Sequence, residues 1–200
     1  MRTQTSTQAD TAMTITQAET AMTIKDAFND DEWFLLSAMP GMIGAAMSNA
    51  APSGIIGTIR EMSAGMRASV HARETHPDSE LINALLSKAD NWDQARNKMA
   101  DYRERAQQRV SSANISSREE LQAMAIEDCR AATALVGERC SESEAHAYKQ
   151  WTIDIALAVA KAAKEGSILG IGGERISAAE RELLHRIEST LGVQSGILFA

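Results

Sequence analysis

The residues whose types best suit binding chemistry lie in a glycine-rich loop near the C-terminus. Four glycines fall within residues 166–173, just before a helix that we predict from residue 178 onward. Backbone N–H groups in such a loop, aided by the dipole of the following helix, can hold an anion. Glu174 and Glu180, however, add negative charge where a phosphate would bind, and no strand precedes the loop. The composition therefore favours glycines that let an apolar loop cross closely over neighbouring helices.

The segments on either side of this loop resemble a known family. The runs Ala-Val-Ala-Lys-Ala-Ala-Lys-Glu165-Gly166 and Ile176-Ser-Ala-Ala-Glu180-Arg-Glu-Leu-Leu184 are similar to the tellurite-resistance B-like helical family. In that family an apolar helix ends in an Asp-Gly pair, and the next helix begins with a serine and a glutamate. The similarity covers residues 151–191, which also look like the C-terminal part of helical bacterial proteins of unknown activity. It implies a helical fold and a stress-related role in a bacterium.

Acidic residues of the loop give the one metal-binding hypothesis. The resemblance implies that acidic residues of the turn bind a divalent cation, which here points to Glu165 and Glu180. The chain departs from the family in having glutamate at position 165 and nine residues, 167–175, where the family has one or two. With Glu174 in the same loop, the hypothesis is a divalent-metal or small-ligand site formed by residues 165–180. We expect no other cofactor.

Catalytic constellations are absent from the sequence. Glu182-x-x-His185 is half of the motif used by di-iron helical bundles, but no second copy occurs, so we expect a solvated histidine. Cys129 follows Glu127 and Asp128, whose charges would raise the pKa of its thiol and make it a poor nucleophile. Neither a Gly-x-Ser-x-Gly motif nor a Walker loop is present. The sequence therefore favours a protein that is not an enzyme.

Residues 33–59 carry no charge and are numerous enough to cross a membrane as a helix. Pro40, Asn49 and Pro52 interrupt the segment, so it contains no unbroken apolar helix of about 20 residues. The pattern favours a buried helical hairpin, and peripheral membrane association through residues 33–59 is the alternative.

Methionines make the hairpin of residues 33–66 a candidate for contact with other proteins. Met39, Met42, Met62 and Met66 have flexible, polarizable side chains that adapt to an interface. Together with the missing catalytic motifs, they predict a non-enzymatic protein that acts through protein–protein contact, most simply as a homo-oligomer.

Capping and helix-breaking residues in the sequence predict where the helices begin and end. A serine followed three residues later by a glutamate forms a capping box, in which each side chain accepts a hydrogen bond from the other residue's backbone N–H. Three such pairs precede apolar-periodic segments, and a glycine marks the last helix end. They are Ser117 with Glu120, Ser141 with Glu144, Ser177 with Glu180, and Gly192. Periodicity and breakers add helices over 33–49, 55–73, 81–86 and 91–110.

These elements predict an all-α, single-domain bundle of six or seven helices, because no period-two alternation competes with them. We expect an unstructured N-terminal tail over residues 1–25, a helical domain over 26–194 and a short tail over 195–200. A weak similarity between the hairpins at 33–66 and 151–191 suggests two repeated units packed about a pseudo-twofold axis.

Composition excludes some partners. A net charge of −7 and a pI near 5.2 argue against nucleic acid, and the basic stretch 96–109 is interleaved with acids, as on a solvated helix face. Cys129 and Cys140 lie on or just beyond one predicted helix, about 16 Å apart, which is too far for a disulfide. With no export signal in the first 27 residues, the sequence predicts a cytoplasmic protein.

Overall fold

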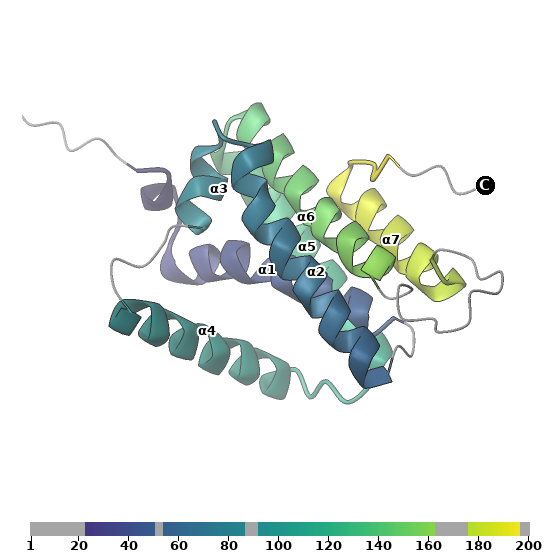
Figure 1. The fold of residues 1–200 in the computed structure, drawn as a ribbon. Coiled ribbons are helices and arrows are strands. Elements are labelled where there is room, and N and C mark those ends of the chain that lie inside the picture. The colour runs from purple at the N-terminus through teal and green to yellow at the C-terminus, as the bar shows by residue number, and fades with distance from the viewer. Residues whose placement is uncertain (1–22, 51–53, 87–91, 163–175, 197–200) are drawn as a thin grey trace, which may run out of the picture.

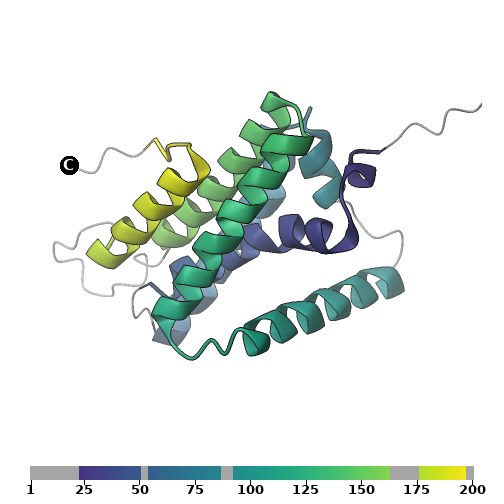
Figure 2. The same cartoon turned by 180° about the vertical axis from the view of Figure 1, so that it is seen from behind.

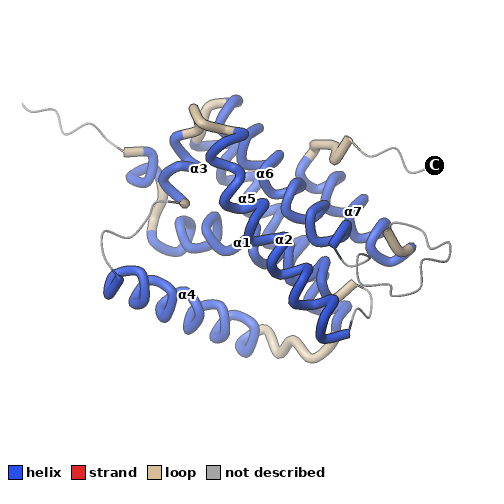
Figure 3. The backbone as a smooth tube through the Cα atoms, in the orientation of Figure 1, coloured by secondary structure: helices blue, strands red, loops and turns tan. Residues whose placement is uncertain are grey.

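Helices form most of the described part of the chain, which in this computed structural model comprises residues 23–50, 54–86, 92–162 and 176–196. No strand occurs within these ranges, and seven α-helices confirm the predicted all-α class (Figure 3). In chain order they follow a short 3-10 helix, η1. The elements are η1 (Ile24–Ala27), α1 (Asp30–Ser48), α2 (Gly54–Thr75), α3 (Glu80–Leu85), α4 (Trp92–Ser112), α5 (Arg118–Arg139), α6 (Glu142–Ala162) and α7 (Ala178–Leu191).

Two of the three predicted capping boxes form completely. At the start of α5, the Glu120 N–H donates to Ser117 Oγ over 3.1 Å, and the Ser117 N–H donates to Glu120 Oε2 over 2.9 Å. Ser177 and Glu180 make the same exchange at α7, which ends as predicted at Gly192 with a left-handed φ of 68°. These helix ends were predictable because their hydrogen bonds join residues close in sequence.

At the start of α6, only one of the two hydrogen bonds of the third predicted capping box forms, so this prediction is partly wrong. The Glu144 N–H donates to Ser141 Oγ over 3.3 Å, but the Glu144 carboxylate turns away from Ser141. It instead accepts hydrogen bonds from the N–H groups of Glu80 and Leu81, at 2.8 and 3.2 Å, and from the Ser79 hydroxyl at 2.5 Å. Glu144 therefore caps α3 across the fold, because α3 begins beside the start of α6.

Helix α6 is the centre of the bundle and packs against α1, α2, α3, α5 and α7 (Figure 1). Two glycines allow α1 and α2 to come close to it. A Cβ atom on Gly65 would lie 3.2 Å from Val159 Cγ2, and one on Gly44 would lie 3.5 Å from Ile155 Cγ2. The abundance of small residues in the sequence thus serves close helix packing.

Helix α1 fills the core as the buried-hairpin interpretation expects. Leu36, Met39 and Ile43 have no exposed surface, and the helix continues through Pro40 to Ser48. Among the described residues, no helix is long and apolar enough to cross a membrane. The suggested repeat places its two tryptophans differently, because Trp151 is buried in α6 whereas Trp33 lies at the edge of the core against Phe28.

Helix α4 lies along the outside of the bundle. Both views show it beside α1, on the outer side of the other helices (Figures 1 and 2). None of its described residues is buried or belongs to the hydrophobic core. The described side chains of α4 therefore hold it by contacts other than core packing.

Candidate functional site

The predicted metal-binding residues are only partly within the described chain. Glu180 is buried and caps α7, where its Oε2 atom accepts hydrogen bonds from the Ser177 N–H at 2.7 Å and the Ser177 hydroxyl at 2.6 Å. Glu165 and Glu174 lie outside the described residues. Within those residues no three His, Cys, Asp or Glu side chains gather closely enough to hold a metal ion. A cation or ligand site at 165–180 stays a prediction.

The predicted contact methionines separate into different environments. Met39 is fully buried in the core, so in this structure it is not open to contact with another protein. Met42 is partly buried and lines a cavity between α1, α4 and α5. The Met62 side chain lies outside the described residues, whereas Met66 is 70% exposed. The position of Met39 around the helix explains its burial, because it lies one turn from both Leu36 and Ile43 on the buried face of α1.

Exposed apolar side chains do gather on α2. Met66 and Val70 lie one turn apart, are each 70% exposed, and are the large hydrophobic residues most open to solvent in the described chain. Arg67, His71 and Glu74 lie beside them along a shallow groove between α2 and α6. His71 Nδ1 is 2.7 Å from Glu74 Oε2. We call these five residues the α2 face.

A second set of polar contacts holds α4 to α1. Arg105 Nη2 lies 2.6 Å from Asp31 Oδ1, and the Arg105 guanidinium stacks over the Phe34 ring at 4.3 Å. Tyr102 adds an aromatic contact to Phe34, with ring centroids 5.6 Å apart, and its hydroxyl points to the Ala38 carbonyl at 3.4 Å. Among the described residues, arginine and aromatic side chains thus hold α4 against α1, whereas buried apolar side chains hold the other helices together.

One turn further along, Arg109 joins α4 to α5 through a two-pronged ion pair. Its Nε donates to Asp128 Oδ2 over 3.1 Å, and its Nη2 contacts Asp128 Oδ1. The Asp128 side chain is only 2% exposed, whereas Arg109 is 46% exposed. Two parallel hydrogen bonds fix the orientation of the guanidinium as well as its position.

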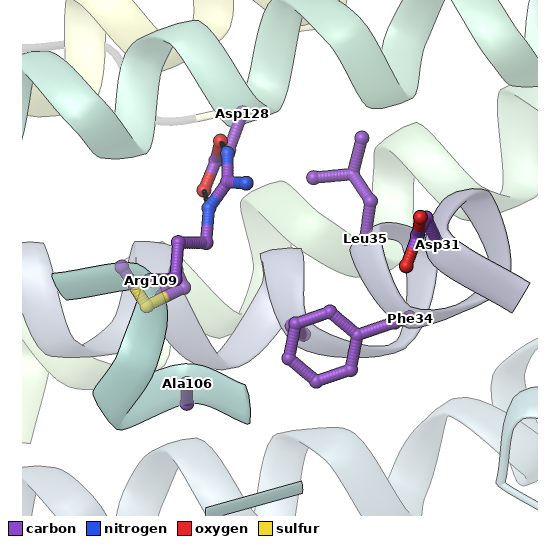
Figure 4. A pocket seen from close by; sticks show the side chains of 8 residues that line it. Asp31, Phe34, Leu35, Ala106, Arg109 and Asp128 are labelled. Atoms are coloured by element: carbon purple, nitrogen blue, oxygen red, sulfur yellow. Dashed lines mark hydrogen bonds and ion pairs between the residues drawn. The ribbon is translucent and has the colours of Figure 1, made fainter. Parts of the chain in front are cut away.

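A cavity of about 260 Å³ lies between this ion pair and α1. Figure 4 shows Arg109 and Asp128 paired at one side of the space, with Leu35, Phe34 and Asp31 across from them. Ala38, Met42 and Ala106 complete the lining. We call Asp31, Phe34, Leu35, Ala38, Met42 and Asp128 the receptor surface, because α4 is bound to it.

Sequence reasoning missed the role of these arginines. Arg96, the first residue of the basic stretch 96–109, does form a local pair on the same helix, with its Nη2 at 2.9 Å from Asp93 Oδ1. Arg105 and Arg109, however, reach out to other helices. Their spacing of one turn was visible in the sequence, but their partners lie 74 and 19 residues away along the chain.

The cysteines are free, as expected, but the main cause of the raised Cys129 pKa differs from the predicted one. Burial raises the pKa of the Cys129 thiol to about 12, with the Asp128 charge a smaller contribution. Burial also raises the pKa of Cys140. His185 is exposed, as predicted, with its Nδ1 atom 3.8 Å from Glu188.

Another buried acid lies where α1 and α2 meet. Glu61 is 1% exposed, and its Oε2 accepts a hydrogen bond from the Ser48 hydroxyl. Its Oε1 has no hydrogen-bond partner among the described residues. Side chains of residues 54–60 and 62, next to it on α2, are outside the described part of the structure. Glu61 therefore defines no site by itself.

Comparison with known proteins adds no family to this description. The chain matches no protein-family model, no curated protein and no solved structure. The resemblance of residues 151–191 to the tellurite-resistance B-like family stays a prediction.

Proposed function

We propose that this chain is a protein-contact module that self-associates through the α2 face. The observation that carries the proposal is the exposure of Met66 and Val70, each 70% open to solvent on adjacent turns of one helix. Burying such side chains against a second copy is favourable by about 25 cal/mol for each Å² of apolar surface removed from water. Methionine also adapts its shape to the surface that it meets.

The charges of the α2 face are arranged so that two copies complement each other. A twofold axis passing between residues 70 and 71 pairs two α2 helices antiparallel and places Arg67 opposite Glu74 of the second copy. The same contact occurs twice across the axis. Val70 then meets His71 of the second copy at the centre. Arg67 is exposed and forms no salt bridge with another described residue, which leaves it open to this contact.

Sedimentation velocity over a range of protein concentrations tests this proposal. Val70→Glu places a charge at the centre of the contact and is expected to shift the protein to monomer. Ala134→Glu, at an exposed alanine on α5, is the control and should leave association unchanged. A wild-type chain that sediments as a monomer throughout would refute the proposal.

A charge exchange makes the test specific for the twofold arrangement. Arg67→Glu and Glu74→Arg should each weaken association, because each places like charges together twice. The chain with both changes should associate again. Equal weakening by the single and the double changes would argue against this pairing.

We also propose a cytoplasmic location. It is supported by Cys129 and Cys140, which are both free thiols, as is usual in a reducing compartment.

A further inference from the structure

We propose that the receptor surface binds a helix from another protein, and that α4 occupies this surface within the chain. The partner helix carries two arginines one turn apart with a large apolar residue directly after the first, the pattern Arg-Φ-x-x-Arg, where Φ is Leu, Met or Phe. This inference does not depend on self-association through the α2 face. It rests on how α4 is held, on what lies beneath it and on how incompletely it fills the space.

First, the described side chains of α4 hold it by polar and aromatic contacts. Among them, Tyr102, Arg105 and Arg109 contact α1 and α5, and these three residues lie on one stripe of the helix. None of its described residues enters the core. A helix held in this way can be displaced without disrupting the bundle, because the core keeps its own contacts.

Second, the receptor surface offers a specific charge arrangement. Asp128 is a buried carboxylate on α5, and Arg109 provides its only ion pair among the described residues. Asp31 lies on α1 and receives Arg105. A buried carboxylate strongly favours a bound cation, and arginine suits it because two hydrogen bonds can form at once. A competing helix therefore needs arginine at the position of Arg109. At the position of Arg105, arginine also suits the surface, because it can pair with the exposed Asp31 and stack over the Phe34 ring.

Third, α4 fits this surface imperfectly. Between its two arginines the residue that lines the cavity is Ala106, and about 260 Å³ remains open against Phe34, Leu35 and Met42. These walls are apolar, so a larger apolar side chain would enter the space and exclude water from it. A helix with Leu, Met or Phe at this position therefore binds more tightly than α4 does. Helices that place apolar and arginine anchors into a groove are a common form of recognition.

Peptides that reproduce α4 provide a direct test with the full-length chain. Three fluorescent peptides are compared by anisotropy: residues 92–112 unchanged, the same peptide with Ala106→Leu, and the Ala106→Leu peptide with Arg105→Gln and Arg109→Gln. We expect the Ala106→Leu peptide to bind at least about tenfold more tightly than the unchanged one, because three added carbons become buried. The peptide without arginines should not bind.

Weakening α4 in the chain should expose the same surface. Tyr102→Ala combined with Arg105→Gln removes contacts to α1 and leaves the pair of Arg109 with Asp128 in place. This variant should bind the Ala106→Leu peptide more tightly than the wild-type chain does, because the internal competitor is weaker. Val70→Glu on the α2 face is the matched control and should bind like the wild type. That control separates this inference from the proposed self-association.

Two results would contradict the proposal that the receptor surface binds a helix from another protein. Equal affinity of the three peptides for the wild-type chain would show that neither the arginines nor the apolar residue is recognised. Absence of binding to both the wild type and the Tyr102→Ala, Arg105→Gln chain would show that α4 belongs permanently to the bundle. If that variant does not fold, as judged by circular dichroism, the three peptides on the wild-type chain decide the question.

Discussion

Helices α4 and α6 have the same length of 21 residues but are attached to the protein in opposite ways. In α6, buried residues occur along the whole helix, and neighbouring helices cover it on several sides. In α4, no described residue is buried, and arginine and tyrosine side chains reach across to α1 and α5. Helix α6 is therefore part of the hydrophobic core, whereas the described residues of α4 attach to the outside of the bundle.

Composition explains this contrast. Helix α6 has several buried alanines, and its Ile155 and Val159 side chains lie against Gly44 of α1 and Gly65 of α2. Helix α4 has many long charged side chains, whose heads stay in water while their stems cover apolar surface. Stability should therefore respond strongly to changes in α6 and weakly to most changes in α4.

The largest expected effect is in α6. Ile155→Ala should lower the free energy of unfolding by about 3 to 4 kcal/mol, because a fully packed side chain is replaced by a cavity. Urea denaturation followed by circular dichroism measures this loss. Val110→Ala on α4 is the control and should cost less than about 1 kcal/mol. Similar losses for the two variants would remove the distinction between the helices.

The exception on α4 is the buried ion pair. Arg109→Ala should lower the free energy of unfolding by about 2 to 3 kcal/mol, since it leaves the Asp128 carboxylate buried without a cation. Adding Asp128→Asn to that variant should recover part of the loss, because an amide has no charge to neutralise. The same denaturation experiment tests both. A double variant less stable than Arg109→Ala would contradict the explanation.

A smaller effect should appear on the alkaline side. Folding raises the Cys129 pKa from 9.0 to about 12, so the unfolded chain loses its thiol proton first as the pH rises. The wild type should therefore lose stability between these pKa values, by about 1 kcal/mol at roughly pH 10. Cys129→Ala lacks this contribution and should lose less stability over the same interval. Parallel pH dependences for the two proteins would contradict burial as the cause.

The smallest effect should come from the exposed contact of α4 with α1. Arg105→Ala should cost less than about 1 kcal/mol, because Asp31 is fully accessible to solvent and water screens the pair. The loss should shrink further in high salt. Denaturation at low and high ionic strength measures both. A loss as large as that of Arg109→Ala would show that burial does not separate the two arginines.

Most helix positions followed from the sequence because they depend on neighbours. The boxes at Ser117 and Ser177 and the stop at Gly192 use bonds that span five residues or fewer, so the sequence contains all of their parts. Asn29 with Glu32 forms another such box at α1 that could have been read in the same way. Apolar periodicity then indicated which faces turn inward.

Only the tertiary structure decided what the polar side chains do. Glu144 has the spacing of a capping residue for α6, yet it caps α3 because the fold brings the start of that helix within hydrogen-bond distance. Arg105 and Arg109 have the appearance of a solvated helix face, yet they bind Asp31 and Asp128 on distant helices. Long charged side chains can reach several partners, and the packing of the helices determines which partner lies within reach. Sequence determined the helices and their apolar faces, and tertiary structure determined which charges meet.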